Sequence, residues 1–258
     1  MQEPRPNQER AEQAGTPAER SLPVLGAGTH VTEGPPLKCP DCPAASRGVF
    51  EDLLPGDGDP CGMQRVTLEA RAAFPPNLFE GQAFALVRRG IVVRQRADPQ
   101  QRVVSIDVAG PGAYLPLGSL AGSPGSIATG YAASDALLCL YAQSEPDRSL
   151  DCLSQPTALE LVRLQQEAVA RLERLADARS RSTVQRRVAA LLCALADTLS
   201  PQHPHDTVPA LSLRDLAGLI QVRHESLCRE LGKLVKRGLI RRSLESITLI
   251  DRSGLETL

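Results

Sequence analysis

The chain has 258 residues, enough for two modest domains, and 29 Lys and Arg balance 30 Asp and Glu. Whole-chain charge therefore does not indicate nucleic-acid binding, and any basic surface must be local. Acidic residues interrupt the first twenty positions and no apolar segment follows them, so we expect no signal peptide. No apolar run approaches the roughly 20 residues of a membrane span. We expect a cytoplasmic protein without membrane association.

Residues 1–37 are rich in Pro, Gly, Glu, Gln and Thr without periodic apolar spacing, which predicts a disordered tail. A cysteine cluster follows, with Cys39 and Cys42 in a C-x-x-C pair and Cys61 in a Gly/Pro/Asp loop. In a cytoplasmic protein, such cysteines are better explained as thiols, metal ligands or redox groups than as a disulfide framework.

Residues 64–141 consist of short Val/Ile/Leu-rich segments separated by glycine and proline, as in an all-β sandwich or barrel. Residues 98–101 look like a hairpin tip between two of these segments. We expect strands at 65–69, 83–88, 91–95, 103–107 and 136–141, within a folded domain spanning 38–150.

A long helix is predicted next, over residues 155–180. Apolar residues at spacings of three and four form one stripe: Leu161, Leu164, Ala168, Leu172 and Leu175. Charged and amide side chains, including Arg171, are expected on the other faces. The stripe could be a two-fold dimer seam or could pack against the β domain of its own chain. A second helix is expected from Ser182, where Ser182-Thr-Val-Gln185 has the pattern of a capping box.

Residues 211–250 have the pattern of a winged helix-turn-helix, within a domain spanning 181–258. A proline-containing loop over 200–209 precedes it. Ser212 and Asp215 form a second capping-box pattern before a short helix. A second helix is expected from about Arg223 to Arg237, with Gly238 as its stop. The segments 239–242 and 246–250 flank a short turn, as expected for a hairpin wing.

The exposed face of that second helix is polar and basic. Arginine is the best bidentate donor to guanine and glutamate can accept from the cytosine amino group, so Arg229 and Glu225 suit neighbouring base pairs in a major groove. His224 and Cys228 lie beside them as further base-contacting candidates. Phosphate contacts are expected from Arg223, Ser226, Lys233, Lys236, Arg241 and Arg242. Taken singly, each charge could equally belong to a solvated helix face.

Over roughly residues 39–258 the chain resembles the CRP/FNR family of bacterial transcription regulators. The resemblance rests on the motif Glu225-Ser-Leu-Cys-Arg229, on Gly238-Leu239-Ile240 and on Phe84-Ala-Leu-Val-Arg-Arg-Gly90. It implies an α+β fold: an N-terminal antiparallel β-roll sensor like a cyclic-nucleotide-binding jelly roll, a long dimerisation helix and the winged domain. It also implies a homodimer on an inverted-repeat operator in double-stranded DNA, with RNA polymerase as a further candidate partner. Gln221, where the family has a turn glycine, and Glu230, at a normally apolar position, depart from the pattern.

The resemblance also bears on the effector. A cyclic-nucleotide sensor of this family needs a glutamate and an arginine in the stretch after Gly110, but residues 113–130 contain no acid and no base. We therefore expect no cyclic nucleotide. In the FNR branch three N-terminal cysteines and one at the end of the β-roll hold a [4Fe–4S] cluster. Cys39, Cys42 and Cys139 match that arrangement, Cys61 is the candidate for the displaced third N-terminal ligand, and Cys152 is a spare.

Several alternatives stay open at this point. The cysteines could instead bind zinc or form a thiol switch, an unknown small molecule could be the effector, or Cys139 could simply be a buried strand residue. A metal-binding interaction protein without DNA affinity is a different class of function. The four histidines, His30, His203, His205 and His224, form no nucleophile–base constellation, and we expect no enzymatic activity.

Overall fold

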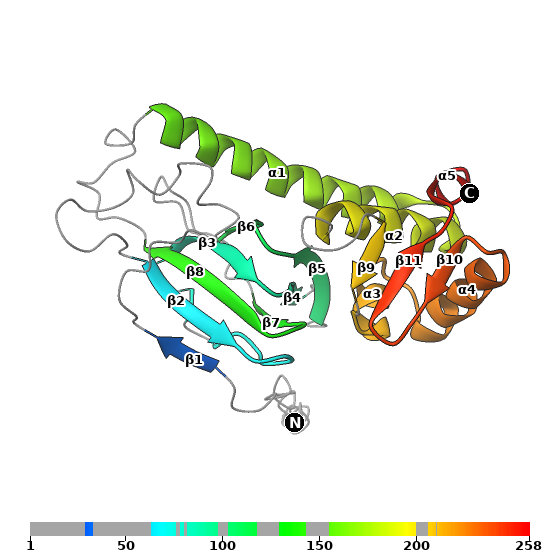
Figure 1. The fold of residues 1–258 in the computed structure, drawn as a ribbon, viewed down its shortest axis with the longest axis horizontal. Helices are drawn as coiled ribbons and strands as arrows, with labels where there is room; N and C mark the ends of the chain where they lie inside the picture. The colour runs from blue at the N-terminus through cyan, green and yellow to red at the C-terminus, as the bar shows by residue number, and fades with distance from the viewer. Residues whose placement is uncertain are drawn as a thin grey trace, which may run out of the picture.

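Two β-sheets, a long helix and a mixed C-terminal domain follow one another along the chain (Figure 1). The computed structural model describes residues 29–32, 63–75, 78–79, 82–97, 103–117, 129–142, 155–199, 206–209 and 211–258. This is the α+β arrangement that the sequence predicts.

The N-terminal half contains two antiparallel sheets with an aliphatic core between them. One sheet has the strand order β1-β2-β8-β3-β6 and the other has the order β5-β4-β7. Their inward residues, such as Val66, Val87 and Leu138 of the first sheet and Val92 and Ala132 of the second, form one buried cluster. The strands are β1 (Thr29–Thr32), β2 (Met63–Leu68), β3 (Gln82–Arg89), β4 (Val92–Ala97), β5 (Val103–Ala109), β6 (Tyr114–Pro116), β7 (Thr129–Ala132) and β8 (Ala136–Ala142).

Five of these strands, β2, β3, β4, β5 and β8, overlap the predicted segments to within two residues at each end, and the remaining three were not predicted. A wholly disordered tail over 1–37 is wrong for Thr29–Thr32, which pairs antiparallel with β2. Backbone hydrogen bonds to a sheet edge define this strand, so it needs no apolar periodicity. The short β6 and β7 lie among glycines that obscure an alternating pattern. The expected hairpin tip at 98–101 lies outside the described residues, between the paired strands β4 and β5.

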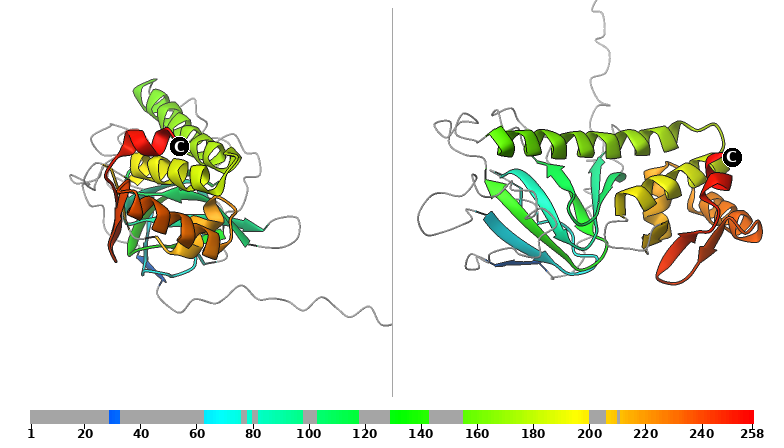
Figure 2. Two further views of the ribbon diagram at one scale, coloured as in Figure 1. Left: turned by 90° about the vertical axis from the view of Figure 1, so that its right-hand side faces the viewer. Right: turned by 45° about the horizontal axis from the view of Figure 1, so that its top comes forward.

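Helix α1 (Gln155–Ser180) runs along the β-sheets toward the C-terminal domain, and α2 (Val184–Leu199) turns back beneath its end (Figures 1 and 2). The cap of α2 is Thr183, whose hydroxyl accepts a hydrogen bond from the Arg186 amide at 3.2 Å, and not Ser182 as predicted. The difference is one residue, within the usual uncertainty of a helix boundary.

The C-terminal domain has the predicted helix-turn-helix and wing. It comprises β9 (Thr207–Pro209), α3 (Leu213–Leu219), α4 (His224–Lys236), β10 (Ile240–Arg242), β11 (Ser246–Leu249) and α5 (Arg252–Glu256). Ser212 caps α3 by accepting from the Asp215 amide at 3.1 Å, and Gly238 ends α4 with φ of 71°. The predicted loop over 200–209 contains the unpredicted β9, which completes a sheet in the order β10-β11-β9.

Candidate nucleic-acid interface

Helix α4 presents two chemically opposite faces. Leu227, Leu231 and Leu234 are buried against the rest of the C-terminal domain and hold the helix in place. The opposite face is in solvent, where Glu225 in the first turn and Lys236 in the last turn complement the helix dipole. The sequence therefore folds into a fixed helix whose polar face remains free for a ligand.

That polar face carries charges which the chain itself does not neutralise. Glu225 and Arg229 are exposed one helical turn apart, and neither forms an ion pair with another described residue. Lys233 differs, because its ammonium donates to Glu230 at 2.8 Å on the same helix. The predicted base-contacting pair thus lies on one accessible face, with His224 and Cys228 adjacent to it: the Cys228 sulfur is 3.8 Å from His224 Nε2.

The wing adds a second basic surface. Strands β10 and β11 pair from Ile240 opposite Leu249 to Arg242 opposite Ile247, and Ser243 closes the turn by accepting from the Ser246 amide at 3.0 Å. Arg241 and Arg242 are exposed on β10, and within the described chain they form no ion pair. Such guanidinium groups suit contacts with phosphate.

The turn between α3 and α4 contains the unusual Gln221. Its φ of 54° lies in the left-handed region, which explains why a glycine is favoured at this position. The other departure, Glu230, lies mostly buried on the side of α4 near Lys233, and its side chain is 13% exposed. Neither residue disturbs the exposed face.

The predicted dimer stripe on α1 requires a correction. Leu161, Leu164, Ala168 and Leu175 are at most 6% exposed within a single chain, and Leu172 is half-buried. These four side chains cannot form a seam with a second copy, because they already pack against their own chain. The alternative that the sequence left open, packing within the chain, is the one observed.

Arg171 was expected on an outer face, but it lies on this inner face and is 4% exposed. Its guanidinium donates to both carboxylate oxygens of Asp107 on β5, at 2.8 and 2.9 Å, and to the Tyr114 carbonyl at 3.1 Å. Arg94 approaches the same carboxylate at 3.5 Å, and burial lowers the pKa of this second guanidinium. The spacing 168, 171, 175 could have indicated this position, but a charged residue in an apolar stripe is normally assigned outward.

Of the four predicted cluster ligands, only Cys139 lies among the residues that the structure describes. Cys39, Cys42 and Cys61 lie outside the described residues, as does Cys152. Cys139 is buried on β8, where it pairs in register with Arg65 and Leu86 and faces away from the core between the two sheets. Across the described ranges, no three His, Cys, Asp or Glu side chains converge as metal ligands.

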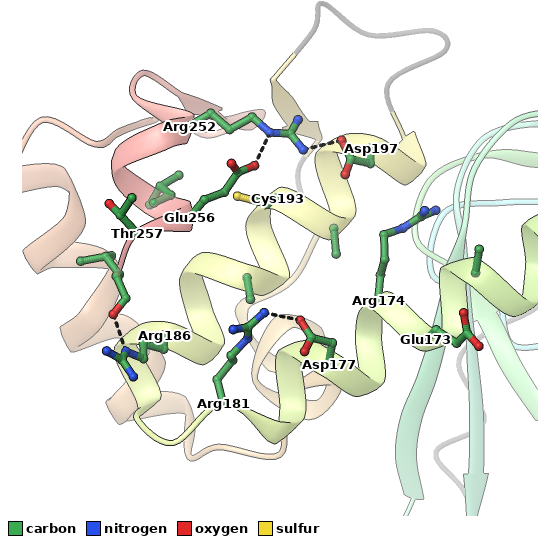
Figure 3. Close-up of a pocket in the computed structure, with 15 residues that line it drawn as sticks. Glu173, Arg174, Asp177, Arg181, Arg186, Cys193, Asp197, Arg252, Glu256 and Thr257 are labelled. Atoms are coloured by element: carbon green, nitrogen blue, oxygen red, sulfur yellow. Dashed lines mark hydrogen bonds and ion pairs between the residues drawn. The ribbon is translucent and has the colours of Figure 1, made fainter.

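A cavity of about 770 Å³ lies between α1, α2 and α5 (Figure 3). Its ionic side chains largely neutralise one another: Arg181 pairs with Asp177 at 2.6 Å, and Arg252 pairs with Asp197 at 2.7 Å. Cys193 lines the cavity from the apolar face of α2, and burial raises the pKa of its thiol to about 11. The residue is 8% exposed and belongs to the buried core.

The described fold is a β-sheet domain joined by a long helix to a winged helix-turn-helix, which is a class of DNA-binding module. Among the described helices, none has the length and hydrophobicity needed to cross a membrane.

Comparisons with known proteins show a similar C-terminal domain and a similar overall fold. Residues 186–258 match the Crp-like helix-turn-helix domain. FixK2 from Bradyrhizobium japonicum has a similar structure, with 18% identity, a TM-score of 0.62, and coverage of 77% of this chain and 98% of that one. The CRP-family regulator TTHB099 from Thermus thermophilus has 18% identity and a TM-score of 0.58, over 74% and 94% of the two chains. The CRP/FNR-family regulator TTHA1359 of the same organism has 24% identity and a TM-score of 0.51, over 75% and 96%. None of the curated protein sequences matches.

Residues 186–258 thus match the Crp-like helix-turn-helix domain, and the fold of the described chain is similar to the folds of CRP-family and CRP/FNR-family regulators. A helix-turn-helix domain is a module that binds DNA, so residues 186–258 are a DNA-binding domain.

Proposed function

We propose that the protein is a homodimeric regulator that recognises an inverted-repeat operator through Glu225 and Arg229 and responds to a redox or gas signal. The observation that carries the proposal is the exposed, unneutralised face of α4 beside the basic wing. A guanidinium and a carboxylate one turn apart, rigidly held, match the donors and acceptors of adjacent base pairs.

The test starts with selection of binding duplexes from a random pool by the full chain, followed by gel shifts over a range of salt concentrations. We expect an inverted repeat to be enriched. Replacing Arg229 with Ala should relax preference at one base pair per half-site, whereas Lys236→Ala should weaken binding to all duplexes and lower the salt slope by about 1. Recovery of no preferred sequence by the wild-type chain would contradict the proposal and favour an interaction protein without DNA affinity.

The dimer seam belongs on the outer face of α1. Leu159, Val162 and Val169 are 62%, 54% and 45% exposed, and they recur at intervals of three and seven residues. This is the spacing of a coiled-coil seam, so a second copy of α1 would cover the side chains that the chain itself leaves in water. Val162→Glu with Val169→Glu should convert the protein to a monomer in analytical ultracentrifugation. Val103→Glu, a similarly exposed valine on β5 and outside α1, is the matched control.

For the sensor we propose a [4Fe–4S] cluster held by Cys39, Cys42, Cys61 and Cys139. Support comes from the sequence spacing and from the position of Cys139 on the sheet face opposite the core. Four thiolates are the donor set that such a cluster requires, and the bound group would supply oxygen- or nitric-oxide-sensitive redox chemistry. We expect operator affinity to differ between anaerobic and oxidised protein.

Anaerobic purification with iron and zinc quantitation tests this assignment. Visible absorbance and iron should disappear in Cys39→Ala/Cys42→Ala, while Cys228→Ser, at a half-buried position on α4 outside the set, should retain both. Zinc without iron would replace the cluster by a zinc site. Absence of both metals would leave a thiol switch or another effector.

A further inference from the structure

The two domains share more than the helix that joins them. Ile91, Val93 and Val108 of the smaller sensor sheet belong to the same buried cluster as the leucines of α2, α3 and α4. Gly110 lies directly against Leu199, whose Cδ2 is 2.7 Å from the position that a Cβ would take. The sensor sheet therefore packs directly on the DNA-binding domain.

Arg179, near the end of α1, bridges this interface. Its Nε donates to the Leu219 carbonyl at 2.5 Å, and its Nη2 donates to the carbonyls of Ser105 and Ile106 at 3.2 Å each. Leu219 is the last residue of α3, so the guanidinium satisfies a carbonyl that the helix leaves open. One side chain thus joins three elements: α1, α3 and β5.

The Ser105 and Ile106 carbonyls on β5 can accept hydrogen bonds from Arg179 because the strand is locally irregular. The register between β4 and β5 shifts after Arg94, which pairs with Asp107, while Gln95 pairs with Ser105. Ile106 is the extra residue of a β-bulge, and β5 is an edge strand of its sheet. Two consecutive carbonyls, those of Ser105 and Ile106, are therefore available to the same guanidinium.

Tyr131 on β7 makes a second contact with α3. Burial and a hydrogen bond to Asp215 raise the pKa of the Tyr131 phenol, and Ser212 also bonds to it. Asp215 and Ser212 form the capping box of α3, so the sensor sheet contacts this short helix at its N-terminus as well as at its C-terminus. Between these contacts, Gly218 faces Ser105 closely: a Cβ there would lie 3.4 Å from the serine hydroxyl.

We propose that Arg179 and Tyr131 are positioning residues that fix the orientation of α3, and with it α4, relative to the sensor sheet, and so determine which half-site spacing the dimer accepts. The inference rests on the proposed function, because spacing has meaning only for a dimer on an inverted repeat. Half-sites differing by one base pair in separation are rotated by about 35° around the DNA axis. A rigidly held pair of α4 helices cannot follow that rotation, whereas freely swivelling domains can.

The experiment measures binding to duplexes in which the spacer of the selected operator is changed by one or two base pairs in either direction. The wild-type chain should lose at least about tenfold in affinity on each altered spacing, as expected when geometry forbids simultaneous engagement of two modules. Arg179→Gln with Tyr131→Phe should reduce this loss to below about threefold, with affinity for an isolated half-site unchanged. The matched control is Arg181→Gln, which removes an exposed guanidinium whose one ion pair among the described residues is with Asp177.

A second variant approaches the interface from the other side. Gly218→Met keeps every hydrogen-bonding group and favours the helical conformation, but its side chain should separate α3 from Ser105. It should flatten the spacing profile in the same way. Retention of the wild-type profile by both variants would overturn the proposal.

Failure of the recognition proposal would appear differently: the wild-type chain would select no operator at all. In that case calorimetry still tests the coupling: one unfolding transition in wild type and two in the variants supports it, and one in all proteins overturns it.

Discussion

Arginine has opposite roles on α4 and on the inner face of α1. On α4, Arg229 is exposed and forms no ion pair with another described residue. On α1, Arg171 is 4% exposed and both carboxylate oxygens of Asp107 bind it. The guanidinium of Arg229 is available to an external ligand, while that of Arg171 is hydrogen-bonded within the protein.

The difference teaches how burial decides the role of a charge. A buried guanidinium must find its acceptors within the protein, because its desolvation is costly without them. An exposed one stays solvated until a ligand replaces water, so it can contribute to binding without contributing to stability. Mutations should therefore separate the two roles cleanly.

The largest effect is expected when the buried site is broken. Replacing Asp107 with Ala leaves Arg171 and Arg94 buried without their shared carboxylate, which should lower the free energy of unfolding by about 3–5 kcal/mol. Urea denaturation followed by circular dichroism measures this. A loss below about 1 kcal/mol would show that the buried arginines find other acceptors, and the contrast with α4 would fail.

The next effect concerns the exposed site. Arg229→Ala should weaken binding to the selected operator by about 1–3 kcal/mol, the usual contribution of one bidentate base contact. Its unfolding free energy should change by no more than about 0.5 kcal/mol, because nothing in the fold depends on this side chain. Equal loss of stability and affinity would contradict the separation of roles.

The same contrast explains what sequence reasoning could predict. Helix α4 and its flanks are specified locally: Ser212 and Gly238 mark boundaries, and the leucine spacing marks the buried face. The partners of Arg171 and Arg179 on β5 lie 64 and 74 positions away in the sequence, and those of Arg179 are carbonyls at a β-bulge. No local pattern reveals which strand faces a helix. The dimer stripe was misassigned for this reason, since apolar periodicity shows that a face is buried but not what covers it.

A smaller effect on the free energy of unfolding is expected in the turn between α3 and α4, which precedes the helix that carries Arg229. Gln221 adopts a φ of 54°, so Gln221→Gly should raise the free energy of unfolding by about 0.5–1 kcal/mol through relief of the left-handed conformation. Gln221→Ala, which keeps a Cβ, should give no such gain. Thermal unfolding of the three proteins in parallel checks the order. A gain shared by both variants would point to the glutamine side chain and not to the backbone.

The smallest effect is expected on the flank of α1, outside the stripe of Leu159, Val162 and Val169, where an arginine is paired but not buried. Arg163 donates to both oxygens of Glu160, at 2.7 and 2.5 Å, and is 42% exposed. The geometry resembles that of Arg171 with Asp107, yet water screens this pair, so Arg163→Gln should lower the free energy of unfolding by less than about 1 kcal/mol. Raising the salt concentration should shrink the difference further in Arg163→Gln but not in Asp107→Ala. If the two substitutions were equally destabilising, hydrogen-bond geometry and not burial would decide what an arginine contributes to this fold.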